Sequence, residues 1–270
     1  MVFPLAFIGG GNMAGAILGG LLRAGQVQAG DVIVVEPVQA QRDKLAAEFG
    51  VQALAAGDAT LARAGTVVWA VKPQLFTEAA APLKAWLGGA LQLSVMAGIP
   101  SASIARATGS ERVVRSMPNT PALIGQGIAG LFARPAVSAD ERATVERLLA
   151  PTGQTLWVDR EADLDAVTAL SGSGPAYFFL VVEAMMAAAV EMGLTAEQGR
   201  QLALATCGGA AALGLASSES PTTLRERVTS KGGTTHAAVS VLQAQGVDAA
   251  VRRAVLAAHA RAAELGAEFG

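Results

Sequence analysis

The chain begins with an apolar segment that runs directly into a cluster of glycines, and this combination constrains the fold more than any other feature. The segment Pro4-Leu-Ala-Phe-Ile8 predicts a buried strand, and Gly9-Gly-Gly11-Asn12-Met13-Ala14 follows it without a spacer. In this G-x-G-x-x-A pattern the first glycine makes a tight turn, the second admits a pyrophosphate, and the small last residue packs helix against strand. We therefore predict a helix that begins near Asn12, with its N-terminus facing the phosphates of a dinucleotide.

Alternation of short apolar runs with Ala-rich amphipathic segments continues over the first 160 residues. The second predicted strand, Asp31–Val35, ends at Glu36, about 20 residues beyond the glycines, where an acidic group meets the adenosine ribose. Further strands are predicted at residues 66–71, 91–95, 112–116, 127–133 and 155–158. Repeated βαβ units of this kind predict an α/β fold with a doubly wound, mostly parallel Rossmann-type sheet.

Beyond residue 163 the pattern becomes helical. Apolar residues recur at helical spacing over residues 175–193, 196–215 and 248–265, with almost no strand-like run. Gly172 and Gly174 are expected to break the chain before Pro175, which suits a first helical turn. We predict two domains, a dinucleotide-binding domain over 1–160 and an all-helical domain over 161–270. The Ala/Gly-rich helices over 184–216 suit an interwoven dimer, and packing within one chain is the alternative.

Composition excludes several classes of function. The net charge is −2, and no run of Lys and Arg interleaved with aromatic residues indicates a nucleic-acid partner. The most apolar stretch, 176–190, is interrupted by Glu183, and no segment has the roughly 18 uninterrupted apolar residues of a membrane span. The N-terminus lacks the basic region of a signal peptide, so the expected location is the cytoplasm.

Three further loops are expected to surround the cofactor, because ligands of open α/β sheets bind at the carboxyl ends of the strands. Lys72 has the alternative of being a solvated cation, and the prolines around Asn119 could simply fix a turn. Otherwise Asn119 is held rigidly enough to direct its amide at a nicotinamide or a substrate. The candidate cofactor contacts in these loops are Ala70, Val71, Lys72, Pro73, Ala97, Gly98 and Asn119.

The ordered set of motifs resembles the pyrroline-5-carboxylate reductase family. It comprises the glycine loop, Ala70–Pro73, Met117–Pro121, Leu170-Ser-Gly-Ser-Gly-Pro-Ala-Tyr177 and Val228-Thr-Ser-Lys-Gly-Gly-Thr-Thr235. The resemblance implies reduction of the cyclic imine 1-pyrroline-5-carboxylate to L-proline by a nicotinamide cofactor. It also implies that the helical domain binds substrate and forms an interleaved homodimer, with a larger ring of dimers as a further possibility.

Such a reaction requires mainly that the enzyme orient the substrate for hydride transfer, because a protonated imine is already electrophilic and needs neither a strong acid nor a metal. In Ser230–Thr235 the glycines expose backbone N–H groups, and a helix starting near Thr234 would face the substrate carboxylate. An ordinary helix start capped by Thr is the alternative. The resemblance assigns Thr235, as the catalytic residue, to the ring nitrogen and the carboxylate region. It assigns Ser230, Gly233 and Thr234 to the carboxylate. Glu161 is a weaker candidate for the cationic nitrogen, or else a surface acid.

Several features leave alternatives open. Many family members end the second strand with Ser, Asn or Arg, which suit NADPH, whereas Glu36 favours NADH unless it rotates away and Arg42 approaches the 2′-phosphate. Arg227 and Lys231 also depart from the family pattern, and Lys231 either attracts the carboxylate or is solvated. The segment 171–174 is either a hinge and helix cap, which we favour, or a dimer-contact loop lining the active site.

Two rival functions follow from the glycine motif alone. The first is a 3-hydroxyacid dehydrogenase. These enzymes resemble one another in using a lysine on a helix of the second domain as the acid/base, whereas residues 175–215 of this chain contain no lysine. A non-catalytic dinucleotide-binding scaffold is the second rival, and it leaves the loop before Thr235 without a purpose.

Overall fold

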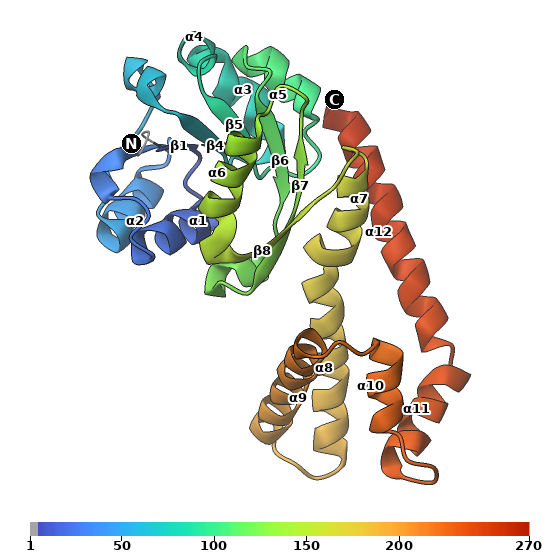
Figure 1. The fold of residues 1–270 in the computed structure, drawn as a ribbon. Helices are drawn as coiled ribbons and strands as arrows, with labels where there is room; N and C mark the ends of the chain where they lie inside the picture. The colour runs from blue at the N-terminus through green and yellow to red at the C-terminus, as the bar shows by residue number, and fades with distance from the viewer. Residues whose placement is uncertain (1–4, 270) are drawn as a thin grey trace. The chain divides into compact units, whose positions relative to one another are not determined.

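The computed structural model describes residues 5–269, so Pro4 of the first predicted strand lies outside the described residues. Its sheet has eight strands in the order β3-β2-β1-β4-β5-β6-β7-β8 (Figure 1). The strands are β1 Leu5–Ile8, β2 Val32–Val35, β3 Ala53–Leu54, β4 Thr66–Trp69, β5 Leu91–Ser94, β6 Val113–Met117, β7 Gly127–Ala133 and β8 Gly153–Trp157. All seven predicted strands are confirmed within a few residues, and the two-residue β3 is the one that the pattern missed.

Strand pairing is parallel throughout the sheet except between β6 and β7. The interior strand β1 pairs with β2 and β4, so Leu5 lies opposite both Val32 and Thr66. The antiparallel pair places Val114 opposite Ala133. Because β1, β4 and β5 are covered on both faces, their residues are buried without alternation, as expected for parallel strands. The predicted doubly wound, mostly parallel sheet is confirmed.

Helices cover both faces of this sheet (Figure 1). One face packs against α1, α2 and α6 through side chains that include Ile17, Leu45 and Val145, and the other against α3, α4 and α5 through Phe76, Leu87 and Ile104. The helices are α1 Asn12–Arg23, α2 Gln39–Phe49, α3 Phe76–Ala80, α4 Lys84–Leu87, α5 Ser101–Thr108, α6 Ala139–Leu149 and α7 Asp163–Val167. Short 3-10 turns lie at Ala29–Asp31, Ala59–Arg63, Pro73–Leu75, Ala81–Leu83, Thr120–Ile124 and Ala150–Thr152.

The chain divides into two compact units. One comprises the residues up to Ser173 together with those from Ala258, and the other comprises Gly174–Ala257. The predicted boundary at residue 160 follows the last strand, whereas α7 groups with the sheet. The remaining helices are α8 Gly174–Glu191, α9 Ala196–Ala216, α10 Pro221–Arg227, α11 Thr234–Ala244 and α12 Val247–Phe269. Within the helical unit α8 and α9 pack closely, since a Cβ at Gly199 would lie 2.9 Å from the Ala189 Cβ.

At the predicted break, a π-helical turn, Thr168–Gly172, ends at Gly172, Ser173 forms a bend, and α8 begins at Gly174 with Pro175 in its first turn. The division between the two compact units falls at the same place. The Ser173 N–H donates to the Thr168 carbonyl at 2.8 Å, the five-residue step of a π-turn. The glycine at 172 permits a close approach, since a Cβ there would lie 2.6 Å from the Met117 Cε.

Helix Asp163–Glu191, with its 29 residues, is long and apolar enough to cross a membrane by length and composition alone. Little of it is buried, and large apolar side chains remain exposed on α8 and α9, including Phe178, Phe179, Leu180 and Leu202. Large apolar side chains exposed in this number indicate an interaction surface.

Candidate active site

The glycine loop forms the base of a cofactor cradle. Gly9 has φ +94°, and a Cβ on it would lie 2.7 Å from the Ala70 carbonyl oxygen. Only glycine therefore fits at this position, where the glycine loop meets the loop Ala70–Pro73. Gly11 is exposed, with no atom within 4 Å of a Cβ placed there. As the residue before α1, Gly11 brings no capping oxygen, which leaves the first N–H groups of the helix for an anion. This arrangement fits the pyrophosphate of a dinucleotide.

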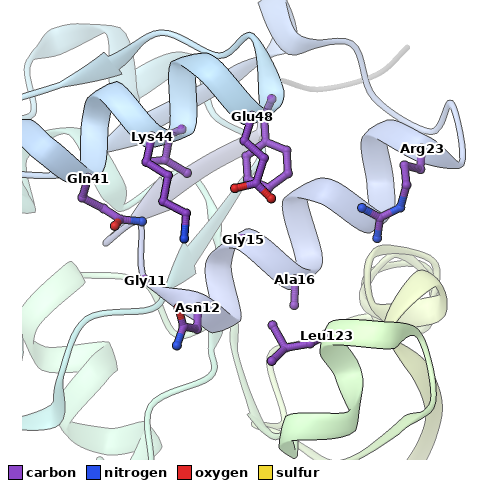
Figure 2. Close-up of a pocket in the computed structure, with 11 residues that line it drawn as sticks. Gly11, Asn12, Gly15, Ala16, Arg23, Gln41, Lys44, Glu48 and Leu123 are labelled. Carbon is purple, nitrogen blue, oxygen red and sulfur yellow. The ribbon is translucent and has the colours of Figure 1, made fainter.

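A pocket of about 120 Å³ lies beside this loop, between α1 and α2. Figure 2 shows the Lys44 side chain extending from α2 toward Gly11 and Asn12. Gln41, from the same helix, donates its side-chain amide to the Gly10 carbonyl. Sequence reasoning missed both residues, and their signal was only their place on the helix that follows Glu36. The lining residues are Gly11, Asn12, Gly15, Ala16, Arg23, Gln41, Lys44, Leu45, Glu48, Phe49 and Leu123.

Glu36 is buried and its carboxylate is fixed in place. Oε2 accepts the Gly10 N–H at 2.9 Å, and Oε1 accepts the Val38 N–H at 2.9 Å. The structure thus brings Glu36 to the glycine loop, as the spacing predicts. Arg42 lies nearby, but Nη1 donates to the carbonyls of Glu36 at 2.8 Å and Pro37 at 2.7 Å rather than to a carboxylate. The guanidinium is therefore engaged by the backbone.

The other predicted cofactor loops have distinct environments. Lys72 is exposed, while Ala97 and Gly98 are half-buried in the loop after β5. Asn119 uses its amide within the fold: Nδ2 donates to the Ser171 carbonyl at 3.2 Å, and Oδ1 accepts the Ile128 N–H at 3.0 Å. This amide joins the end of β6 to the π-helical turn, which favours the turn-fixing alternative for Asn119.

Glu161 also has its partners within the sheet unit. Oε1 accepts the Ser101 N–H at 2.6 Å and Arg115 Nη1 at 2.9 Å, while Oε2 accepts the Ser101 hydroxyl at 2.6 Å. Burial alone would raise the pKa of Glu161, but the bonds from Ser101 and the neighbouring guanidinium together hold that pKa below its ordinary value. The carboxylate is ionised and satisfied, and these contacts give no support to a substrate role.

The helical unit holds the predicted carboxylate loop together. Gly233 donates its N–H to the Ser230 carbonyl at 3.0 Å, and α11 begins at Thr234 with Gly233 in the capping position. The alternative of a Thr cap is therefore wrong. Since glycine supplies no capping oxygen, the N–H groups of Thr234 and Thr235 at the helix start lack the acceptor that a capping side chain would give.

The two departures from the family pattern differ in their contacts. Arg227 Nη2 lies 2.5 Å from Glu219 Oε1, so this cation is paired within the helical unit. Lys231 is exposed and occurs in no ion pair among those found in residues 5–269. Its charge is therefore available beside Ser230.

Comparison with known proteins matches two segments of the chain. Residues 4–98 match the family model described as NADP oxidoreductase, coenzyme F420-dependent. Residues 161–265 match the model described as pyrroline-5-carboxylate reductase dimerisation. The first match includes the glycine loop, Glu36 and Gly98, and the second includes α8, α9 and the loop before Thr235.

Full-length relatives agree with these matches. Pyrroline-5-carboxylate reductase of Pseudomonas aeruginosa is 46% identical over 98% of both chains, and that of Haemophilus influenzae is 41% identical over 97% of both. The reductase structure from Coxiella burnetii superposes with a TM-score of 0.90 at 36% identity over 98% of this chain and 99% of that one. The Plasmodium falciparum enzyme, solved with NADP bound, gives 0.86 at 26% identity over 98% of both chains. From its glycine loop to its last helix, this chain belongs to the pyrroline-5-carboxylate reductase family.

Proposed function

We propose that this oxidoreductase reduces 1-pyrroline-5-carboxylate to L-proline with a nicotinamide cofactor. The observation that carries the proposal is identity of up to 46% with pyrroline-5-carboxylate reductases over 98% of both chains. The exposed glycine at the start of α1 and the uncapped start of α11 supply sites for the two anions that the reaction brings together, cofactor phosphate and substrate carboxylate.

In this proposal the helical unit orients the substrate. The Ser230 hydroxyl and the Thr234 N–H receive the carboxylate next to Gly233, whose own N–H bonds the Ser230 carbonyl, and the Thr235 hydroxyl contacts the ring nitrogen. The Lys231 charge draws the carboxylate toward this loop. None of these groups has to remove a proton, because the product amine keeps its proton at neutral pH.

The cofactor is assigned to the sheet unit. Gly11, Asn12 and Met13 receive the pyrophosphate, and Gly9 and Ala14 provide the tight turn and the close packing that place them there. Ala70–Pro73 and Ala97–Gly98 line the cradle at the carboxyl ends of β4 and β5. When bound, the nicotinamide supplies the hydride that forms the new C–H bond at the imine carbon. Because hydride carries both electrons, this chain needs only to align the two molecules and exclude competing orientations.

We further infer a preference for NADH. The Glu36 carboxylate is fixed by two backbone N–H groups, so it stays where the ribose hydroxyls are expected and repels a 2′-phosphate. Arg42 would have to leave two carbonyls to neutralise that phosphate. This inference contrasts with the NADP named for the family model and for the Plasmodium falciparum structure.

Oligomerisation explains the apolar surface of the helical unit. We propose a homodimer that covers the exposed side chains of α8 and α9, with a ring of dimers as a larger assembly. A second copy is favoured over a lipid cover because residues 161–265 match a dimerisation family. The cytoplasm remains our predicted location.

A Thr235→Ala variant tests the substrate assignment. We expect the specificity constant for the imine to fall at least tenfold while cofactor affinity stays within twofold, because the hydroxyl contacts substrate alone. Thr222→Ala, an exposed threonine of the same unit, is the control and should retain activity. Equal activity of both variants would contradict the assignment, and a parent without imine-dependent turnover would favour the scaffold.

A further inference from the structure

The loop between β5 and α5 carries two candidate cofactor contacts, Ala97 and Gly98. It begins after β5, at the edge of the sheet where ligands of this fold bind. Gly98 has φ +75°, a conformation that glycine adopts without strain, so the loop follows a defined path. At its first end, the Met96 N–H donates to the Ser94 hydroxyl at 3.2 Å.

The second end of this loop depends on a residue far away in the sequence. Pro100 precedes α5 and has no side-chain oxygen to cap the helix. The Glu161 carboxylate supplies the missing acceptor, because it receives both the N–H and the hydroxyl of Ser101 at 2.6 Å. Ser101 is 1% exposed, so water cannot readily replace this acceptor.

Arg115 fixes the carboxylate from the sheet. Its side chain on β6 is 11% exposed, and Nη1 lies 2.9 Å from Glu161 Oε1. The Arg115 Nε is buried and has no hydrogen-bond partner among the described residues. The guanidinium therefore relies on Glu161, and the carboxylate is held between the sheet and the loop rather than by the loop alone.

We propose that Glu161 is a positioning residue that holds the Ala97–Gly98 loop against the cofactor. The proposal rests on the proposed function in one respect, the assignment of this loop to the cofactor. It replaces the expectation that Glu161 meets the substrate nitrogen. If Glu161 positions the loop, removing its carboxylate weakens binding of the cofactor. If Glu161 meets the substrate nitrogen, the same change weakens binding of the imine.

The test measures dissociation constants of NADH and NADPH by calorimetry and, separately, KM for the imine. In Glu161→Ala, all three bonds disappear, and we expect the cofactor Kd to rise about tenfold, the size of one lost charge-assisted hydrogen bond, with imine KM within twofold. Glu161→Gln retains an acceptor for the Ser101 N–H and should recover most of the cofactor affinity. Glu111→Ala is the matched control, since it breaks the ion pair with Arg134 at 2.5 Å without touching the loop.

Two results would overturn the proposal: an unchanged cofactor Kd in a folded Glu161→Ala protein, or a raised imine KM with an unchanged cofactor Kd. If Glu161→Ala does not fold, Ser101→Ala removes only the hydroxyl bond, and we expect about a threefold rise in cofactor Kd. No rise in that variant would also count against the proposal. Because calorimetry needs no turnover, failure of the proposed reaction in the parent protein is distinguishable from failure of the positioning role.

Discussion

Replacing Glu36 by serine should shift cofactor preference toward NADPH. The carboxylate cannot simply swing aside, since its bonds to the Gly10 and Val38 N–H groups are each 2.9 Å long. A hydrogen bond to a charged group contributes about 1.5–3 kcal/mol, so releasing both costs about 3–6 kcal/mol. The fixed charge therefore acts on whatever occupies the ribose position.

The size of the effect follows from the charge. A phosphate charge about 4 Å from the carboxylate is repelled by about 1 kcal/mol in bulk water and about 4 kcal/mol at an effective dielectric constant near 20. These limits correspond to about fivefold and about a thousandfold in relative affinity. Because Glu36 is buried and bonded to the glycine loop, we expect a result between them.

The assay is the ratio of specificity constants for NADH and NADPH in the parent and in Glu36→Ser. In Glu36→Ser the Gly10 and Val38 N–H groups lose their acceptor, which can lower activity with both cofactors. A loss common to both cofactors cancels in the ratio. Glu48→Gln is the control, because Glu48 lines the neighbouring pocket but is exposed and lies farther along α2. A ratio that stays unchanged in Glu36→Ser, or that changes equally in the control, would refute the electrostatic argument.

Three further predictions separate binding from stability. Gly11→Ala should melt like the parent yet bind cofactor at least tenfold more weakly in calorimetry, because the added methyl meets no protein atom but enters the cradle; normal binding would contradict this. Gly130→Ala should do the reverse and lose about 1–3 kcal/mol of unfolding free energy in a urea titration, since its Cβ would lie 2.6 Å from Val167 Cγ1; an unchanged midpoint would count against tight packing. The pKa of Glu161 is lower in the folded protein than in the unfolded chain, so its ionised carboxylate stabilises the fold. This contribution is complete above the ordinary glutamate pKa of about 4.3 and is lost as pH falls through the folded-state pKa. The stability gap between the parent and Glu161→Gln should therefore narrow below about pH 4, and a gap independent of pH would exclude the ionised carboxylate as its source.

Much of the sheet could be predicted because its signals are local. The glycine loop after β1 and the apolar runs of β2, β4 and β5 each lie within one short segment. Parallel strands buried on both faces appear as continuous apolar runs, so each can be recognised without knowing which strand it pairs with. The two residues of β3 are too few to give such a signal. The π-helical turn was not predicted, because its hydrogen bond from Ser173 to Thr168 has no signal in the sequence.

The local structure of the candidate site was predictable where one segment supplies all of its contacts. The turn before α11 is such a case, although the choice of Gly233 over a threonine as the cap needed coordinates. Glu161 and Asn119 are different, since their partners Ser101 and Ser171 lie 60 and 52 residues away in sequence. No spacing rule links such pairs, so the sequence gives no sign of the contacts that Glu161 and Asn119 make within the fold.

The most direct test of the central claim is the steady-state oxidation of NADH and NADPH with and without 1-pyrroline-5-carboxylate. We expect oxidation that depends on the imine, yields proline in a one-to-one ratio and proceeds with a higher specificity constant for NADH. Faster turnover with NADPH would keep the reaction and discard Glu36 as a barrier. No imine-dependent oxidation with either cofactor would contradict the proposed reaction itself.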